Sequence, residues 1–249
     1  MSESPGHRSL REHLPLSPKR EAHFRWRGTE VSRVEGLTDA VFGFAVTLLV
    51  VALEVPNTFK GLMDVVRGFP AFVICFTLLM IFWNAHFRFH RRYGFEDVYT
   101  RVITMAILVL VVFSVYPLKF LFTSLTVSMF DLDLTNAPHI ESSAQGQVVY
   151  LIYGLGFAGI WGLYSLLYVH ALRKRAELGL SEVELVLTRQ SLYESLIYVG
   201  VCLLSITLAL TTSNPWLPGV IYFLLGPLQG FNGWWHGSKV SAMAKAVTA

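Results

Sequence analysis

Long apolar stretches alternate with short polar connections along most of the chain. A transmembrane helix needs about 20 predominantly apolar residues to cross roughly 30 Å of hydrocarbon, and six stretches approach that length. We therefore expect spanning helices at residues 34–55, 67–88, 99–122, 148–171, 191–211 and 216–235. The pattern predicts an all-α integral membrane protein of six transmembrane helices, with little chain left for a soluble catalytic domain.

The polar segments predict how the chain is divided. Residues 1–28 are polar, basic and without an apolar core of the kind that a signal peptide carries, so we expect a mobile cytoplasmic arm. Residues 29–236 would form the six-helix transmembrane domain, and residues 237–249 a cytoplasmic tail. Residues 124–146 would be an external polar connection, and Pro117 would lie near a helix end.

Charge sets the expected orientation. Charged residues make up 15% of the chain and hydrophobic residues 53%, whereas soluble domains carry about 25% charged residues. Apart from Lys60, Arg67 and Lys119, every Lys and Arg lies in the segment up to Arg33, in the tail, or in and beside the connections after the second and fourth spans. The positive-inside rule then predicts a multi-pass protein of the cell membrane with both termini in the cytoplasm, which requires an even number of spans.

Other candidate chemistry is weak. The GxGxxG pattern at residues 154–159 falls inside a predicted span, where small residues favour close helix packing over a dinucleotide site. His86 and His90 share a helix face, but three neighbouring arginines would repel a metal ion. Cys75 and Cys202 fall in spans and are expected to be small core residues. We expect no enzyme activity, metal site, cofactor or nucleic-acid partner.

The start of the first span carries ionisable residues, which are candidates for function at a membrane boundary. Arg33 and Asp39 are separated by about 600° of helical rotation, so they point to different faces and each needs a partner on a neighbouring helix or subunit. A simple interfacial anchor explains the same residues equally well. Further along, Phe44, Leu48 and Val51 form an apolar stripe that Glu54 continues. The stripe suits core packing or a hydrophobic constriction with an acidic vestibule, and its period leaves both open.

Two short motifs resemble a known family. The segment Arg33-Val34-Glu35-Gly36-Leu37-Thr38-Asp39 is similar to the Arg-x-x-x-Phe-Ser-Asp signature of the transmembrane protein 175 family of potassium channels. Trp83-Asn84-Ala85-His86 resembles the Trp-x-x-His-His motif of the same family. Six spans correspond to one family repeat, and single-repeat prokaryotic members are tetramers. The resemblance therefore implies a homotetramer whose first helices line a central pore.

The resemblance also implies roles for individual residues. Family members select ions with rings of apolar residues, which correspond to a pore constriction at Phe44, Thr47, Leu48 and Val51, with Glu54 at the external pore mouth. A polar network that braces the helices corresponds to Arg33, Thr38, Asp39, Trp83 and His86, and Leu37 belongs to the same structural motif. The sequence departs from the family at Leu37, Thr38 and Phe87, and Phe44 replaces the usual Ile or Leu of the constriction.

These observations predict a potassium-permeable cation channel embedded in membrane lipid, which conducts K+ or another monovalent cation. Four phenylalanines around one axis would either seal the pore by dewetting or present ring faces to a cation. The main alternative is a non-conducting interaction or sensor protein of the same fold. A secondary transporter is less favoured, because residues 34–122 and 148–235 show no convincing internal repeat.

Overall fold

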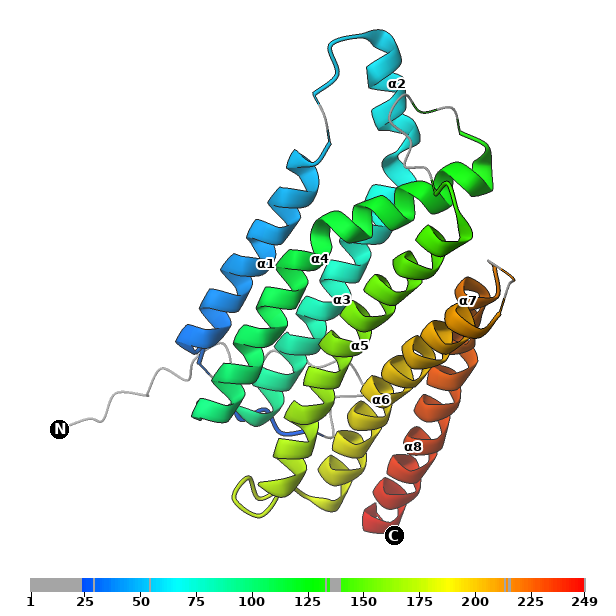
Figure 1. Cartoon of the computed structure of the whole chain (residues 1–249). Coiled ribbons are helices and arrows are strands. Elements are labelled where there is room, and N and C mark those ends of the chain that lie inside the picture. Colours follow the sequence, from blue (N-terminus) through cyan, green and yellow to red (C-terminus); the bar gives the residue numbers. More distant parts are fainter. Residues whose placement is uncertain are drawn as a thin grey trace, which may run out of the picture.

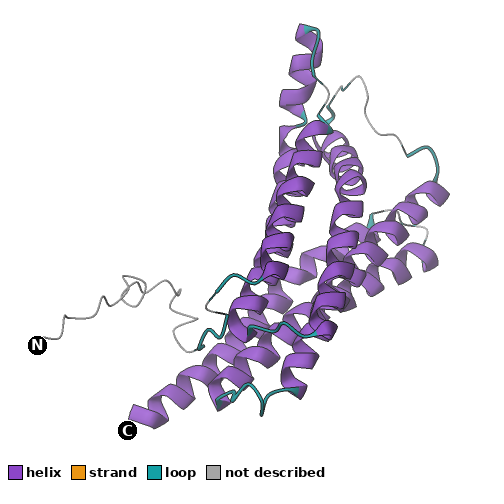
Figure 2. Ribbon diagram, turned by 90° about the vertical axis from the view of Figure 1, so that its left-hand side faces the viewer, coloured by secondary structure: helices purple, strands orange, loops and turns teal. Residues whose placement is uncertain are grey.

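The computed structural model describes residues 24–28, 30–53, 55–132, 134, 140–212, 214 and 216–248, with side chains as far as residue 243. Within these residues every regular element is a helix, and the long helices run side by side (Figures 1 and 2). The elements are α1 (Arg33–Val51), α2 (Phe59–Arg67), α3 (Phe69–Tyr93), α4 (Val98–Phe130), α5 (Ser143–Arg173), α6 (Glu182–Thr211), α7 (Leu217–Val220), the 3-10 helix η2 (Ile221–Leu224) and α8 (Leu225–Thr248).

Among the described residues, five helices are long and apolar enough to cross a membrane: α1, α3, α4, α5 and α6. They correspond to the first five predicted spans. The sixth predicted span is divided between α7, η2 and the first part of α8, and it is not one of the five. Helix α8 continues to Thr248, so the residues predicted to form the polar tail are helical as far as Thr248.

Several helices differ from their predicted bounds. Helix α4 extends to Phe130 and α5 begins at Ser143, so much of the expected polar connection 124–146 is helical. Pro117 lies inside α4, which corrects the expectation that it lies near a helix end. The sequence reading also missed α2, a short helix between the first two long ones. Hydropathy identifies only the apolar residues that fit within a bilayer, whereas the hydrogen-bonded helix continues into the polar residues on either side.

The helices follow one another across the bundle. Helix α1 lies on one flank and packs against α3 and α4, α5 packs against α4 and α6, and α8 covers α6 on the other flank (Figure 1). The start of α1 and the end of α8 lie at the same end of the bundle. Because α3 ends there with Arg88, Arg91 and Arg92, we call it the arginine-rich end.

Local sequence signals fix where the helices begin and end. Ser32 and Ser181 form capping boxes with Glu35 and Glu184, in which side chain and backbone bond reciprocally over the first turn. Helix α3 ends at Gly94, whose φ of 60° is a left-handed conformation that glycine adopts without a steric penalty.

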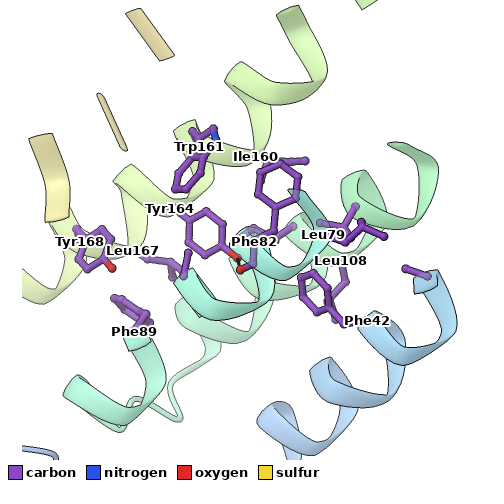
Figure 3. Packing of buried hydrophobic residues seen from close by; sticks show 14 of the residues in the cluster. Phe42, Leu79, Phe82, Phe89, Leu108, Ile160, Trp161, Tyr164, Leu167 and Tyr168 are labelled. Carbon is purple, nitrogen blue, oxygen red and sulfur yellow. Dashed lines mark hydrogen bonds between the residues drawn. The ribbon is translucent and has the colours of Figure 1, made fainter. Parts of the chain in front are cut away.

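The core between the helices is rich in aromatic residues. Phe82 and Tyr164 are fully buried at its centre, and the Tyr164 hydroxyl donates a 2.7 Å hydrogen bond to the Phe82 carbonyl (Figure 3). Gly154 confirms the packing interpretation of the GxGxxG pattern, since a Cβ there would lie 2.5 Å from a side-chain carbon of Ile206. Cys75 and Cys202 are buried, as expected of small core residues.

Candidate functional site

Helix α1 has one face packed in the bundle and one face that the rest of the chain leaves open. Thr38, Phe42, Ala45 and Leu49 are buried toward α3 and α4. On the opposite face Phe44 is 56% exposed and Val51 67% exposed. The side chains of Phe44 and Val51 are not part of the core of their own chain, so packing within one subunit does not explain these two members of the stripe.

The four predicted constriction residues occupy an arc of about 100° on α1. Phe44, Thr47 and Val51 are exposed, whereas Leu48 is half-buried at the edge of the arc and packs against the core. The Thr47 hydroxyl donates to the Gly43 carbonyl at 3.0 Å, which leaves its oxygen lone pairs directed away from the helix backbone. Glu54, the predicted external pore mouth, lies outside the described residues.

Asp39 and Trp83 are brought together across α1 and α3. The Trp83 indole Nε1 donates to the Asp39 carboxylate at 2.8 Å, and the Trp83 ring stacks on Phe87 with centroids 5.5 Å apart. Asp39 lies about 140° around the helix from Phe44, so this bond is beside the exposed stripe and not on it. The expectation that Asp39 needs a partner on a neighbouring helix is met here.

The other predicted network residues lie apart from this pair. His86 is buried between α3 and α4, where a ring nitrogen lies 3.4 Å from the Thr104 hydroxyl oxygen. Its ring contacts the His90 ring at a tilt of 34°, with centroids 4.2 Å apart. The Thr38 hydroxyl bonds within α1 to the Val34 carbonyl at 2.8 Å. A single network that joins the predicted residues therefore stays a prediction. Among the described residues, no group of three or more His, Cys, Asp or Glu side chains forms a metal site.

Arg33 and Leu37 point away from the subunit. Both are exposed, and the Arg33 guanidinium has no hydrogen-bond or ion-pair partner in the part of the chain that the structure describes. Arg33 precedes Phe44 by eleven residues, about three helical turns, so the two side chains share one face of α1. The open face of α1 thus begins with a cation at the arginine-rich end and becomes apolar further along.

The sequence reading missed a second anchor of α1. Glu35 is buried and lies 3.6 Å from Arg91 of α3, while its other oxygen accepts from the Ser32 amide. The signals were present as a Ser-x-x-Glu capping pattern and as arginines spaced three and four apart at the end of α3. Nothing in the sequence pairs the two, because they are far apart along the chain.

The opposite end of α1 borders a cavity of about 590 Å³ between α1, α2, α3 and α4. Lys119 of α4 lies on its wall and donates to the carbonyl of Ala52, the C-terminal cap of α1. A cation at a helix C-terminus is favoured by the helix dipole. Lys119 therefore stabilises the end of α1 from a neighbouring helix.

Asp97 fixes the connection between α3 and α4. Its carboxylate accepts from the Thr100 amide at 2.8 Å, contacts His170 at 2.6 Å and lies 3.6 Å from Lys174. Burial opposes its ionisation, but the hydrogen bonds from Thr100 and His170 prevail and lower the pKa of Asp97 to about 2. The group links the start of α4 to the end of α5.

We expect Asp97→Asn to lower thermal stability at pH 6 by about 1 kcal/mol, since the carboxylate is partly exposed and solvent screens its ion pairs. Because the pKa in the folded protein lies below the usual 3.8, this contribution is complete above about pH 5 and is lost as the pH falls through 3.8 toward 2. Melting in detergent should show the difference between wild type and variant shrinking by more than half at about pH 2.5. Glu96→Gln, at the exposed neighbouring carboxylate, is the control. An undiminished difference at low pH would contradict the assignment.

Five long apolar helices among the described residues define a multi-pass membrane protein, and comparisons with known proteins identify its class. A solved variant of the potassium channel MtTMEM175, in complex with a Nanobody-MBP fusion protein, superposes with a TM-score of 0.77 at 30% identity, over 90% of this chain and 100% of that one. A lysosomal potassium-selective channel TMEM175 homolog from Chamaesiphon minutus shares the fold with a TM-score of 0.53, at 22% identity over 80% of this chain and 96% of that one.

Sequence comparison identifies the particular family. The model of the endosomal/lysosomal potassium channel TMEM175 matches residues 33–117, which include α1, α3 and the first part of α4. A potassium channel from Marivirga tractuosa is 33% identical over 221 residues, which cover 83% of this chain and 88% of that protein. The chain belongs to the TMEM175 potassium channel family, as the two motifs indicated.

Proposed function

We propose that the protein is a potassium-permeable cation channel in which the open faces of four α1 helices surround a central pore. The observation that carries this proposal is the exposure of Phe44, Thr47 and Val51 on one face of α1, while the opposite face is packed in the bundle. The number of subunits follows the resemblance to single-repeat family members.

In this assembly the narrowest ring would be formed by Phe44, with Thr47 and Val51 on the following turns and Leu48 behind them. An apolar ring passes an ion only when it is wide enough to stay wet, so its width sets the barrier. The Thr47 hydroxyls would offer the ion oxygen atoms on the next turn. Glu54, beyond them, would attract cations to the external mouth.

The proposal also includes a membrane topology with six spans. The segment formed by α7, η2 and α8 would be the sixth span, so that both termini lie in the cytoplasm of a cell-membrane protein. The arginine-rich end would then face the cytoplasm, which agrees with the positive-inside rule. Residues 1–28, 29–236 and 237–249 would be the arm, channel domain and tail, and the permeant cation would need no cofactor.

Reconstitution tests the channel directly. Potassium-loaded liposomes that contain the full-length protein should lose potassium faster than potassium-loaded liposomes without protein. An added ionophore lets another cation enter, which balances the charge of the potassium that leaves. Single-particle images of the same preparation should show four subunits with α1 at the centre. Flux equal to that of empty liposomes would reject conduction and favour the alternative suggested by the bulk of Phe44, a non-conducting membrane protein of the same fold.

A further inference from the structure

Residues 24–28 lie against the arginine-rich end of the bundle, contrary to the expectation of a mobile arm up to residue 28. Phe24 is only 5% exposed, with its ring edge-on to Tyr93 at 5.6 Å and 4.9 Å from the guanidinium carbon of Arg92. We call this segment, residues 24–28, the strap. A buried aromatic side chain and a cation over its face hold the beginning of the strap on α3.

Arg27 fixes the strap to the start of α6. Its two terminal nitrogens donate to the two oxygens of Glu184, both at 2.9 Å, and its Nε donates to the Leu178 carbonyl at 2.9 Å. The side chains of Arg27 and Glu184 are 15% and 5% exposed. A two-pronged guanidinium–carboxylate pair of this kind specifies one register of the segment.

The backbone of the strap fits closely against the end of α3. The amides of Arg27 and Gly28 donate to the Arg91 carbonyl at 3.1 and 3.2 Å, which satisfies a carbonyl near the helix end. A Cβ on Gly28 would lie 2.6 Å from the His90 carbonyl oxygen, and one on Gly94 would lie 3.1 Å from the Gly28 nitrogen. Only glycine at both positions allows this approach.

Two routes connect the strap to α1. Trp26 packs edge-on against Phe87 at 6.2 Å, Phe87 stacks on Trp83, and Trp83 bonds Asp39. Separately, Arg91 donates to the Gly28 carbonyl at 3.1 Å and lies 3.6 Å from Glu35 in the first turn of α1. The strap therefore contacts Arg91 directly and reaches Trp83 through Phe87.

We propose that the strap positions the beginning of α1, with Trp26 and Gly28 as positioning residues for the pore mouth. Docking of residues 24–28 fixes Phe87 and Arg91, and these two side chains fix Trp83 and the ion pair to Glu35. Where it concerns conduction, the inference rests on the proposed function. Its structural half, the coupling of strap to α1, is independent of ion flux.

The test compares variants within the strap. Gly28→Ala places a methyl group against α3 and displaces the backbone, whereas Trp26→Ala removes only the contact with Phe87. Trp26→Phe is the rescue variant, because it keeps a ring and removes an indole nitrogen that has no hydrogen-bond partner among the described residues. Arg25→Ala is the matched control, since that side chain is exposed and only the Arg25 backbone makes contacts.

Hydrogen–deuterium exchange of the full-length protein measures the coupling. Amides of residues 33–39 should exchange at least about threefold faster in Gly28→Ala and Trp26→Ala than in wild type, while Trp26→Phe and Arg25→Ala remain near wild type. Potassium flux per channel in liposomes should fall by about threefold in the same two variants, because a displaced pore mouth raises the barrier to ion entry. If Gly28→Ala fails to fold, Trp26→Ala carries the test.

The outcomes separate the two proposals. Unchanged exchange at residues 33–39 in Trp26→Ala would overturn the strap, whatever the flux. Faster exchange with unchanged flux would overturn its role at the pore mouth and leave the channel intact. If the wild-type protein passes no potassium but the two variants still exchange faster than wild type at residues 33–39, the coupling is supported and only the proposed function is rejected.

Discussion

Phe44→Ala is expected to increase potassium flux through the reconstituted protein by about tenfold or more, which corresponds to a barrier lower by about 1.4 kcal/mol. In the proposed tetramer the substitution removes four phenyl groups from one ring and lets water fill the constriction. Preference for potassium over sodium should fall at the same time, since a wider wet pore discriminates less between hydrated ions. Flux measured with each cation in turn, at equal protein density, checks both effects.

The control for Phe44→Ala is Phe113→Ala. Phe113 is a 69% exposed aromatic residue on α4, so its truncation removes the same side chain from the surface of the subunit without touching α1. We expect its flux to equal that of wild type. If Phe44→Ala also conducts like wild type while the protein remains a channel, then the narrowest ring lies elsewhere on α1.

The sequence predicted the first five long helices because their apolar lengths are set by the bilayer and need no tertiary information. It failed where helix continues outside that length. Pro117 illustrates the point: proline has no N–H to donate to the carbonyl of Phe113, yet α4 passes through it. The Tyr153 hydroxyl of α5 bonds the Pro117 carbonyl, a tertiary contact that no local pattern reveals.

The open face of α1 was visible as a period in the sequence, but the period could not distinguish a core stripe from a pore stripe. Exposure of Phe44 together with burial of Phe42 places Phe44 outside the core of its own subunit, and its place in a pore is a proposal. The pairing of Asp39 with Trp83 came from a resemblance between motifs, not from helical geometry. The strap was missed because its partners, Arg91 and Glu184, lie far from it along the chain and its own residues read as part of a basic arm.

Asp39→Ala should lower the thermal stability of the protein in detergent by about 0.5–1.5 kcal/mol, the net contribution of one hydrogen bond, because it removes the acceptor of the Trp83 indole N–H. Trp83→Phe removes the same hydrogen bond from the other side and keeps a ring to stack on Phe87, so its effect should be similar. If both act through one bond, the double variant should be no less stable than either single variant. Asp39→Asn retains an acceptor oxygen and is expected to lose less.

Arg33→Ala distinguishes partners of α1 within its own subunit from partners on a neighbouring subunit. Because Arg33 is exposed and has no partner among the described residues of its own chain, its removal should leave the melting of a dissociated subunit unchanged. In the proposed tetramer the open face of α1 would meet its neighbours, so the same variant should lower the temperature at which the tetramer dissociates. Asp39→Ala, by contrast, should destabilise both forms, since its bond lies within one subunit. Measuring the size of the oligomer during heating, for both variants, distinguishes dissociation of the tetramer from melting of the subunit. Equal effects of Arg33→Ala on subunit and tetramer would place its partner within the chain and remove the reason for a contact between neighbouring α1 helices at this residue.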